Sequence, residues 1–275
     1  MHNIPHRTFH ALILLSSLFI GISCTDGIGT PPPATTAPTT LAPSAIIPEN
    51  AKGKILVFSK TVGFRHDSII SGQKMLQDIA HEQQWAVEFT ENHHLFKSSK
   101  LAEFDAIVWL LTTGDVLEKP QQKAFRTYIE TGGGYLGIHS ASDTESDWSW
   151  YGQLVGAYFS SHPELQTANI VVENNQHPTT RHLQATWRHY DEWYNFDNNP
   201  RAKVNVLLSV DENSYDTGLK TAPVDHPITW YHDMGKGRAF YTALGHTSEA
   251  YQNNANFRQQ IKSALTWVGR LEESP

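Results

Sequence analysis

Residues 54–140 alternate between short apolar runs and longer segments with helical periodicity. Four apolar runs have the length and composition of strands: 54–59, 86–91, 104–115 and 135–140. Two segments between them repeat apolar residues at helical spacing: 66–84 and 118–133. Because the strands are apolar on both faces and alternate with helices, this half predicts a parallel sheet covered by helices on both faces.

The pattern changes after residue 160, where strand-like pieces follow one another with little helix between them. These pieces are 168–173, 187–196, 204–212, 227–234 and 238–245. The sequence "DMGKGR" at 233–238 indicates a hairpin turn between the last two. Residues 249–270 then predict one closing helix. The whole pattern predicts one α/β domain over 52–270, with added β structure in its C-terminal half.

The first 51 residues are predicted to be a targeting segment and a tether. Residues 1–23 have the apolar run of a signal peptide and end before Cys24, the only cysteine. The small residues before Cys24 favour a lipoprotein signal, although Gly21 stands where leucine is usual; an ordinary secretory signal is the alternative. Residues 24–51 are rich in Pro and Thr, which predicts a disordered tether after a lipidated Cys24. The expected location is therefore the bacterial cell envelope.

Charge and cysteine content narrow the class of protein. The formal net charge is −7, which argues against nucleic acid as a partner. A lone cysteine forms no intrachain disulfide. Eight Trp, ten Tyr and fifteen His favour either a heavy aromatic core or a site with amphipathic walls.

Candidate site residues lie at the carboxyl ends of the predicted parallel strands. Sheets of this kind bind their ligands there. Arg65 and His66 follow the first strand, and His139 and Asp143 end the fourth. Glycines precede the strand that ends at His139, as in the tight turns that present catalytic side chains. An imidazole there suits proton transfer, ligand binding or metal binding. The alternative is a buried histidine satisfied by a backbone carbonyl.

The remaining histidines lie in predicted loops. His162, His226 and His246 either converge on the same cleft or remain ordinary loop residues, and His177 is expected on the surface. The predicted domain at 52–270 contains no HxH or HxxxH pair of the kind that often binds zinc. A metal site with ligands remote in sequence stays open, so a divalent metal is an alternative, and the sequence establishes no cofactor.

Two segments place carboxylates beside aromatic rings, a pairing suited to sugars. In "HYDEWYNF", a continuous strand would put Asp191 and Trp193 on one face and Glu192 on the other. An edge strand with one face in the core is the alternative. Trp148 follows Asp143 in "DTESDWSWY", where a helix packing its aromatics inward is the alternative.

Several long strings resemble the ThuA-like family, named for trehalose utilization, over roughly 52–269. They are "FRHDS", "YIETGGGYLGIHSASDTESDWSWYGQLVGAYFSSHP", "DEWYNF", "DHPITWYH" and "GRAFYTALGHTSEAY". The resemblance implies a flavodoxin-like fold, similar to class I glutamine amidotransferases, whose catalytic cysteine is replaced here by His139. Without that thiol, amidotransferase chemistry is excluded. The resemblance also implies a role in carbohydrate catabolism beside dehydrogenases that make keto-sugars. The family's recurrent polar positions match His66, His139, Asp143, His162, Asp191, Glu192, His226 and His246.

The sequence thus predicts an envelope-anchored protein that acts on a sugar or keto-glycoside by histidine and carboxylate chemistry. Such an enzyme would be a hydrolase, lyase or isomerase; the alternative is a non-catalytic carbohydrate-binding lipoprotein. The expected catalytic residues are His139, His66, Asp143 and Asp191. The expected substrate-binding residues are Arg65, Trp148, His162, Glu192, Trp193, His226 and His246. Expected partners are a small carbohydrate, the membrane through the lipid anchor, and a sugar dehydrogenase of the same pathway.

Overall fold

The computed structural model describes residues 44–219 and 225–271. All of them belong to the second of two units into which the chain divides, Thr40–Pro275. The expected signal peptide at 1–23, the lipidated Cys24 and most of the tether lie outside the described residues.

Nine strands of the described residues form one sheet, in the order β2-β1-β3-β4-β11-β10-β9-β6-β7. The first five strands in that order run parallel: β2 (Ala86–Thr90), β1 (Lys54–Phe58), β3 (Ala106–Leu110), β4 (Gly134–Ile138) and β11 (Gly237–Thr242). This is the flavodoxin-like order with β11 in the fifth place. It confirms the α/β fold that the sequence predicts.

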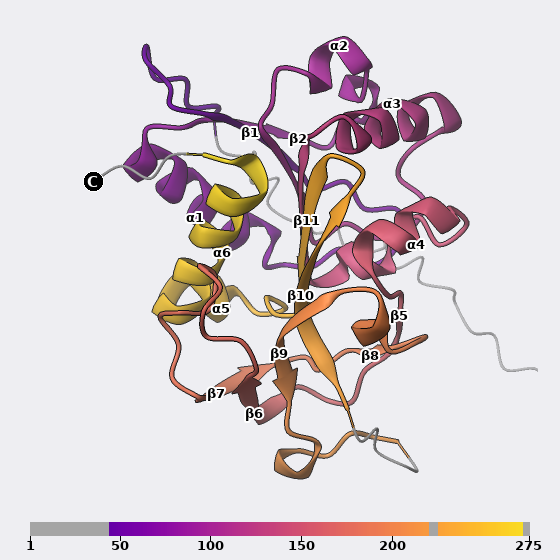
Figure 1. Ribbon diagram of the computed structural model, residues 1–275, viewed down its shortest axis with the longest axis vertical. Coiled ribbons are helices and arrows are strands. Elements are labelled where there is room, and N and C mark those ends of the chain that lie inside the picture. Colours follow the sequence, from indigo (N-terminus) through magenta and orange to yellow (C-terminus); the bar gives the residue numbers. More distant parts are fainter. Residues whose placement is uncertain (1–43, 220–224, 272–275) are drawn as a thin grey trace, which may run out of the picture. The chain divides into compact units, whose positions relative to one another are not determined.

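The other four strands extend the same sheet in antiparallel fashion, which confirms the added β structure: β10 (Pro227–Met234), β9 (Asn205–Val210), β6 (Gln166–Val172) and β7 (Thr186–Asp191). The predicted hairpin joins β10 to β11. Two short strands form a separate pair, β5 (Phe159–Ser161) and β8 (Asn195–Phe196). Figure 1 shows β6, β7 and β9 gathered at one end of the sheet and the parallel strands toward the other.

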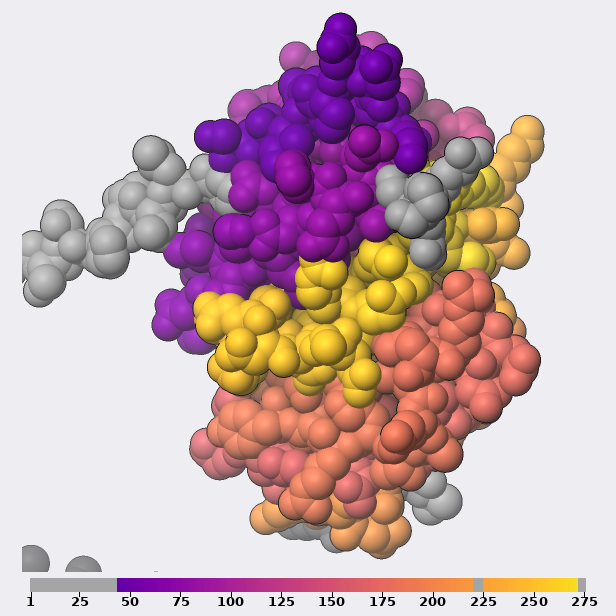
Figure 2. Space-filling view, turned by 90° about the vertical axis from the view of Figure 1, so that its left-hand side faces the viewer, coloured from indigo at the N-terminus to yellow at the C-terminus, as the bar shows by residue number. Residues whose placement is uncertain are grey.

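Helices cover both faces of the parallel strands. Figure 1 shows one set on one side and the other set opposite: α1 (Ile69–Gln83), α5 (Ser248–Asn253) and α6 (Ala255–Gly269), against α2 (Ser98–Leu101), α3 (Lys119–Glu130) and α4 (Ser149–Val155). Short 3-10 turns are η1 (His93–Leu95), η2 (His139–Asp143), η3 (Pro200–Ala202) and η4 (Glu212–Ser214). In Figure 2, α5 and α6 (yellow) lie between the N-terminal half (indigo to magenta) and the antiparallel strands (orange).

The single closing helix predicted for 249–270 is two helices in the structure. Asn254 separates them with an extended backbone, φ −98° and ψ 96°. Its side-chain oxygen accepts a hydrogen bond from the backbone N–H of Phe257 and so caps α6. The shorter helix α5 thus directly follows the loop that carries His246.

The buried strands explain the glycines before His139. Every residue of β3 and β4 is buried. A Cβ on Gly134 would lie 2.5 Å from the carbonyl oxygen of Val268, and one on Gly133 would lie 2.3 Å from the ring of Tyr128. Glycine at these positions therefore lets α6 and the end of α3 pack closely against β4.

One end of the expected tether belongs to the fold. Ile46 forms an antiparallel bridge with Val87 of the edge strand β2, through N–O distances of 3.1 and 2.9 Å. This pairing covers part of an otherwise unpaired sheet edge. Ile46 lies within 24–51, where the sequence predicts a tether.

Of the helices in residues 44–219 and 225–271, none combines the length and apolar character needed to cross a bilayer.

Candidate functional site

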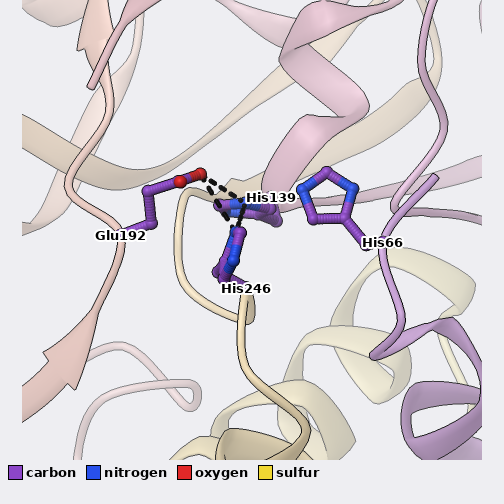
Figure 3. Close-up of side chains that lie close together, drawn as sticks. All are labelled: His66, His139, Glu192 and His246. Carbon is purple, nitrogen blue, oxygen red and sulfur yellow. Dashed lines mark hydrogen bonds and ion pairs between the residues drawn. The ribbon is translucent and has the colours of Figure 1, made fainter. Parts of the chain in front are cut away.

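Four side chains from remote parts of the chain meet at the carboxyl edge of the parallel strands. They are His66, His139, Glu192 and His246, and their ligating atoms all lie within 4.8 Å of one another. Figure 3 shows Glu192 and His66 on opposite sides of His139, with His246 completing the group. The loop after β1 carries His66, His139 directly follows β4, and the segments after β7 and β11 carry Glu192 and His246. We call these residues the His/Glu cluster.

His139 stands at a sharp turn where β4 ends. Its φ of 52° lies in the left-handed region, which is unfavourable for a residue other than glycine. The side chain has no exposed surface. Its Nδ1–H donates to the carbonyl oxygen of Ala243 at 2.7 Å, so Nε2 faces the cluster. His139 is therefore a buried histidine bonded to a backbone carbonyl, as in the expected alternative, and its second nitrogen faces the cluster.

Glu192 links the histidines of the cluster. Its Oε2 lies 3.3 Å from Nε2 of His139 and 3.0 Å from Nδ1 of His246, while Oε1 lies 3.1 Å from Nδ1 of His162. Burial alone would raise the pKa of Glu192, but the adjacent imidazoles of His139 and His246 hold that pKa well below its ordinary value. The group is therefore a carboxylate at neutral pH.

The pKa values of His66 and His246 shift in opposite directions although both residues belong to the cluster. The ring of His66 meets those of His139 and His246 edge to face, with centroids 4.9 and 5.1 Å apart. Burial, followed by the charges of those two rings, lowers the pKa of His66 to about 3. Burial also opposes charge on His246, but the hydrogen bond to Glu192 raises its pKa above the usual value. A neutral His66 thus lies beside a histidine whose charged form is favoured by Glu192.

Asp191 supports the cluster from beneath. It is fully buried and accepts backbone N–H groups from Glu192, Gly245 and His246 at 3.0, 2.8 and 3.0 Å. His189 Nε2 lies 3.1 Å from the same carboxylate. Burial would raise the pKa of Asp191, but the hydrogen bond from His189 and the other partners lower it. Gly245, at φ 110°, lets two successive N–H groups point at Asp191. Asp191, expected among the catalytic residues, therefore contacts His246 through the backbone and holds its loop in place.

The rim of the cluster is formed by exposed residues. The side chains of His246 and His162 are 22% and 42% exposed. Asp143 is exposed in η2, and partial burial of its carboxyl group raises its pKa although nearby His139 lowers it. Phe64 is 66% exposed and its ring lies 4.8 Å from that of His66. Phe64 was not among the site residues expected from the sequence, although it lies only two residues before His66.

The aromatic residues expected to stack on a sugar lie elsewhere. Strand β7 ends at Asp191, so the alternation expected through 187–196 does not continue. Trp193 is 1% exposed and its Nε1–H donates to the carbonyl oxygen of Gln166 at 2.8 Å. Trp148 packs on Trp150 with centroids 4.9 Å apart, as in the inward-packing alternative. Neither ring is presented to the cluster.

Three further polar residues have other partners. The exposed Arg65 pairs with Glu91 at 2.6 Å. His226 is buried; its Nε2–H donates to the carbonyl oxygen of Tyr194 at 2.7 Å, and its Nδ1 pairs with Glu212. His177, expected on the surface, is only 8% exposed. Of the loop histidines whose position was left open, His246 and His162 therefore reach the cluster and His226 does not.

The cluster offers two kinds of chemistry. Neutral and charged imidazoles beside a carboxylate can hold and move protons. The same three imidazoles and one carboxylate could also hold a metal ion, because these are common ligands of divalent transition metals. Both uses require a ligand to approach from the exposed side of His246.

Comparisons with known proteins identify relatives of this fold. A putative ThuA-like protein from Bacteroides uniformis superposes with a TM-score of 0.68 and 24% identity, covering 80% of this chain and 92% of that one. A putative ThuA-like protein from Parabacteroides merdae superposes with a TM-score of 0.64 and 19% identity, covering 81% of this chain and 92% of that one. A beta-galactosidase from Bacillus circulans sp. alkalophilus superposes with a TM-score of 0.51 and 11% identity, covering 81% of this chain and 32% of that one.

No curated protein matches this sequence. The family model described as ThuA, trehalose utilisation, matches residues 54–268, which include the whole His/Glu cluster. That match spans most of the chain and agrees with the structural relatives, so the chain belongs to the ThuA family of trehalose utilisation.

Proposed function

We propose that this chain is an enzyme of carbohydrate catabolism that acts on a sugar or keto-glycoside with its His/Glu cluster. The observation that carries the proposal is the convergence of four ionisable groups within 4.8 Å at the ligand-binding edge of the sheet. Groups with strongly shifted pKa values, gathered in one place, are typical of catalytic sites. Membership of a family named for trehalose utilisation supports a carbohydrate substrate.

A ketone next to the reacting carbon suits this arrangement. The ketone makes the neighbouring C–H acidic, and removal of the proton places negative charge on the ketone oxygen. The His246 imidazolium, stabilised by Glu192 at 3.0 Å, is placed to hydrogen-bond that oxygen. Isomerisation, or elimination followed by hydration, can both begin with this proton transfer.

Residues at the rim complete the proposal. Asp143 and His162 are exposed next to the cluster, which suits groups that exchange a proton with substrate and then with water. The exposed ring of Phe64 offers a flat apolar surface for one face of a sugar. A keto-glycoside arises by oxidation of a sugar hydroxyl, so the proposal includes a sugar dehydrogenase as supplier.

The burial of His139 favours a second candidate, a carbohydrate-binding lipoprotein without catalysis. A fully buried ring cannot touch a substrate unless the site opens. The substitution His139→Ala separates the two functions. Loss of turnover with little change in affinity supports the enzyme, whereas binding of a sugar by the parent protein without any measurable turnover supports the binder.

The proposal also places the protein at the cell envelope, through a lipid on Cys24. The support is the apolar segment that ends at Cys24 and the Pro- and Thr-rich sequence after it. Expression of the full chain and of Cys24→Ser, followed by membrane fractionation and labelling with a fatty acid, tests this part. Equal labelling of both proteins would overturn it.

The substrate class is tested by incubating the purified protein with trehalose, simple glucosides and their 3-keto derivatives. Products are followed by NMR and mass spectrometry. We expect conversion of a keto derivative and none of its parent sugar. Absence of both conversion and binding across the panel would overturn the proposed function.

A further inference from the structure

We propose that the His/Glu cluster is a binding site for one divalent transition-metal ion, with His66, His139, His246 and Glu192 as ligands. Its role in catalysis rests on the function proposed above, whereas its occupancy does not. Imidazole nitrogen and carboxylate oxygen are ligands for Zn²⁺, Mn²⁺, Fe²⁺, Co²⁺ and Ni²⁺. Four protein ligands leave room in a five- or six-coordinate ion for a substrate oxygen.

The spacing of the donor atoms fits one coordination sphere. Nε2 of His139, Nδ1 of His246 and Oε2 of Glu192 form a triangle with sides of 3.2, 3.0 and 3.3 Å. An ion with bonds of about 2.0–2.2 Å separates adjacent ligands by about 2.8–3.6 Å. The fourth donor, on His66, keeps all four within 4.8 Å. One ion can therefore reach the whole group with small side-chain adjustments.

The hydrogen-bond pattern presents lone pairs toward the same point. The Nδ1–H of His139 donates to Ala243 at 2.7 Å, which makes Nε2 the lone-pair nitrogen in the neutral ring. A backbone carbonyl that binds the second nitrogen of a histidine ligand is a usual feature of metal sites. Nδ1 of His246 and Oε2 of Glu192 face that lone pair. Acceptor atoms this close need protons or a cation between them.

The surroundings hold the proposed ligands in place and add negative charge. Asp191 fixes the backbones of Glu192 and His246, and His162 contacts the other oxygen of Glu192. Asp191 and Glu192 are both buried and both pair with histidines. A cation among the four ligands would offset the two buried carboxylates.

The exposed side of His246 leaves an approach for a substrate oxygen. In the proposed reaction, the bound ion would supply the positive charge that stabilises the ketone oxygen, in place of the His246 imidazolium. Asp143 and His162 would remain available for proton transfer, because neither is among the proposed ligands.

Metal binding is tested directly, without an activity assay. The full-length protein is stripped with a chelator, dialysed and titrated with Zn²⁺, Mn²⁺ or Co²⁺ by calorimetry, and bound metal is counted by mass spectrometry. We expect one ion per chain for at least one metal. Glu192→Gln and His246→Ala should each weaken binding at least 100-fold. His81→Ala, which changes an exposed histidine on α1, is the matched control and should bind as the parent does.

Thermal unfolding of each variant without metal shows whether it is folded, and Glu192→Gln keeps the size of the side chain if His246→Ala is unstable. Less than 0.1 ion per chain with every metal, or equal binding by parent and both variants, would overturn the metal site. Metal binding without conversion of any keto-sugar would uphold the site and count against the proposed function. Conversion of a keto-sugar by a protein that binds no ion would uphold the proposed function and overturn the metal site.

Discussion

The carboxylate of Asp191 accepts the backbone N–H of His246 at 3.0 Å and thereby holds the loop that brings this histidine to the cluster. The same carboxylate binds Gly245 and Glu192, so one buried group positions two members of the cluster. Because Asp191 touches them through the backbone, it is a positioning residue.

Asp191→Asn should destabilise the protein and disturb the site together. The amide has one acceptor oxygen where the carboxylate has two, so at least one buried N–H loses its partner. We expect a loss of about 2–4 kcal/mol in the free energy of unfolding, measured with urea, and a lower kcat. Asp78→Asn, at an exposed ion pair, should cost under about 1 kcal/mol. Equal effects of the two substitutions would refute this role.

The left-handed backbone at His139 predicts a difference between two inactive variants. Asn tolerates positive φ better than other non-glycine residues, whereas a β-branched residue does not. His139→Val should therefore be less stable than His139→Asn by about 1–2 kcal/mol, and turnover should fall at least 100-fold in both. Urea unfolding checks the first expectation. Equal stability of the variants would show that the turn does not require this backbone.

Phe64→Ala should raise KM with little change in kcat or stability. The ring is exposed and adjoins His66, so its loss should remove a substrate contact worth about 0.5–1.5 kcal/mol, or about 2–12-fold in affinity. Trp193→Phe removes a buried hydrogen bond and should instead lower stability without changing KM. Steady-state kinetics and thermal unfolding separate the two. A larger change of KM in Trp193→Phe than in Phe64→Ala would show that Trp193 contacts the substrate, as the sequence had led us to expect.

Stability should fall as pH drops from 6.5 to 4, in part through His177. Burial, followed by the charge of Arg238, lowers the pKa of His177 to about 4, and the ring stacks on Tyr231 at 4.2 Å. Between these pH values the unfolded chain binds more protons at this histidine than the folded one. The free energy of unfolding therefore keeps the full contribution of neutral His177 above pH 6.5 and loses it toward pH 4. For this one group it is on the order of 2–3 kcal/mol.

The control is His177→Gln, which should lose less stability than the parent over the same interval. Urea unfolding at a series of pH values measures the difference. Parallel curves for the two proteins would show that His177 does not titrate as proposed.

Topology explains why part of the site could be predicted. The strands that precede His66 and His139 were recognisable as buried and parallel, and parallel strands end at one edge. The place of β11 beside β4 depends on a long-range pairing, so the approach of His246 could not be derived from local pattern. Glu192 and Trp193 lie after the end of β7, so the alternation of faces along a strand does not apply to them. For this reason the sequence pattern did not predict the position of either side chain. His177 is buried by Tyr231 and Trp267, far away in the sequence.

Exchange of the α-proton of a 3-keto-glucoside in D₂O, followed by NMR, tests the central claim that the His/Glu cluster performs carbohydrate chemistry. The parent protein and His81→Ala should exchange this proton at equal rates. His246→Ala, verified as folded, should be slower by at least about 100-fold. Exchange by His246→Ala at the parent's rate, or no exchange by the parent above the rate in buffer, would contradict it.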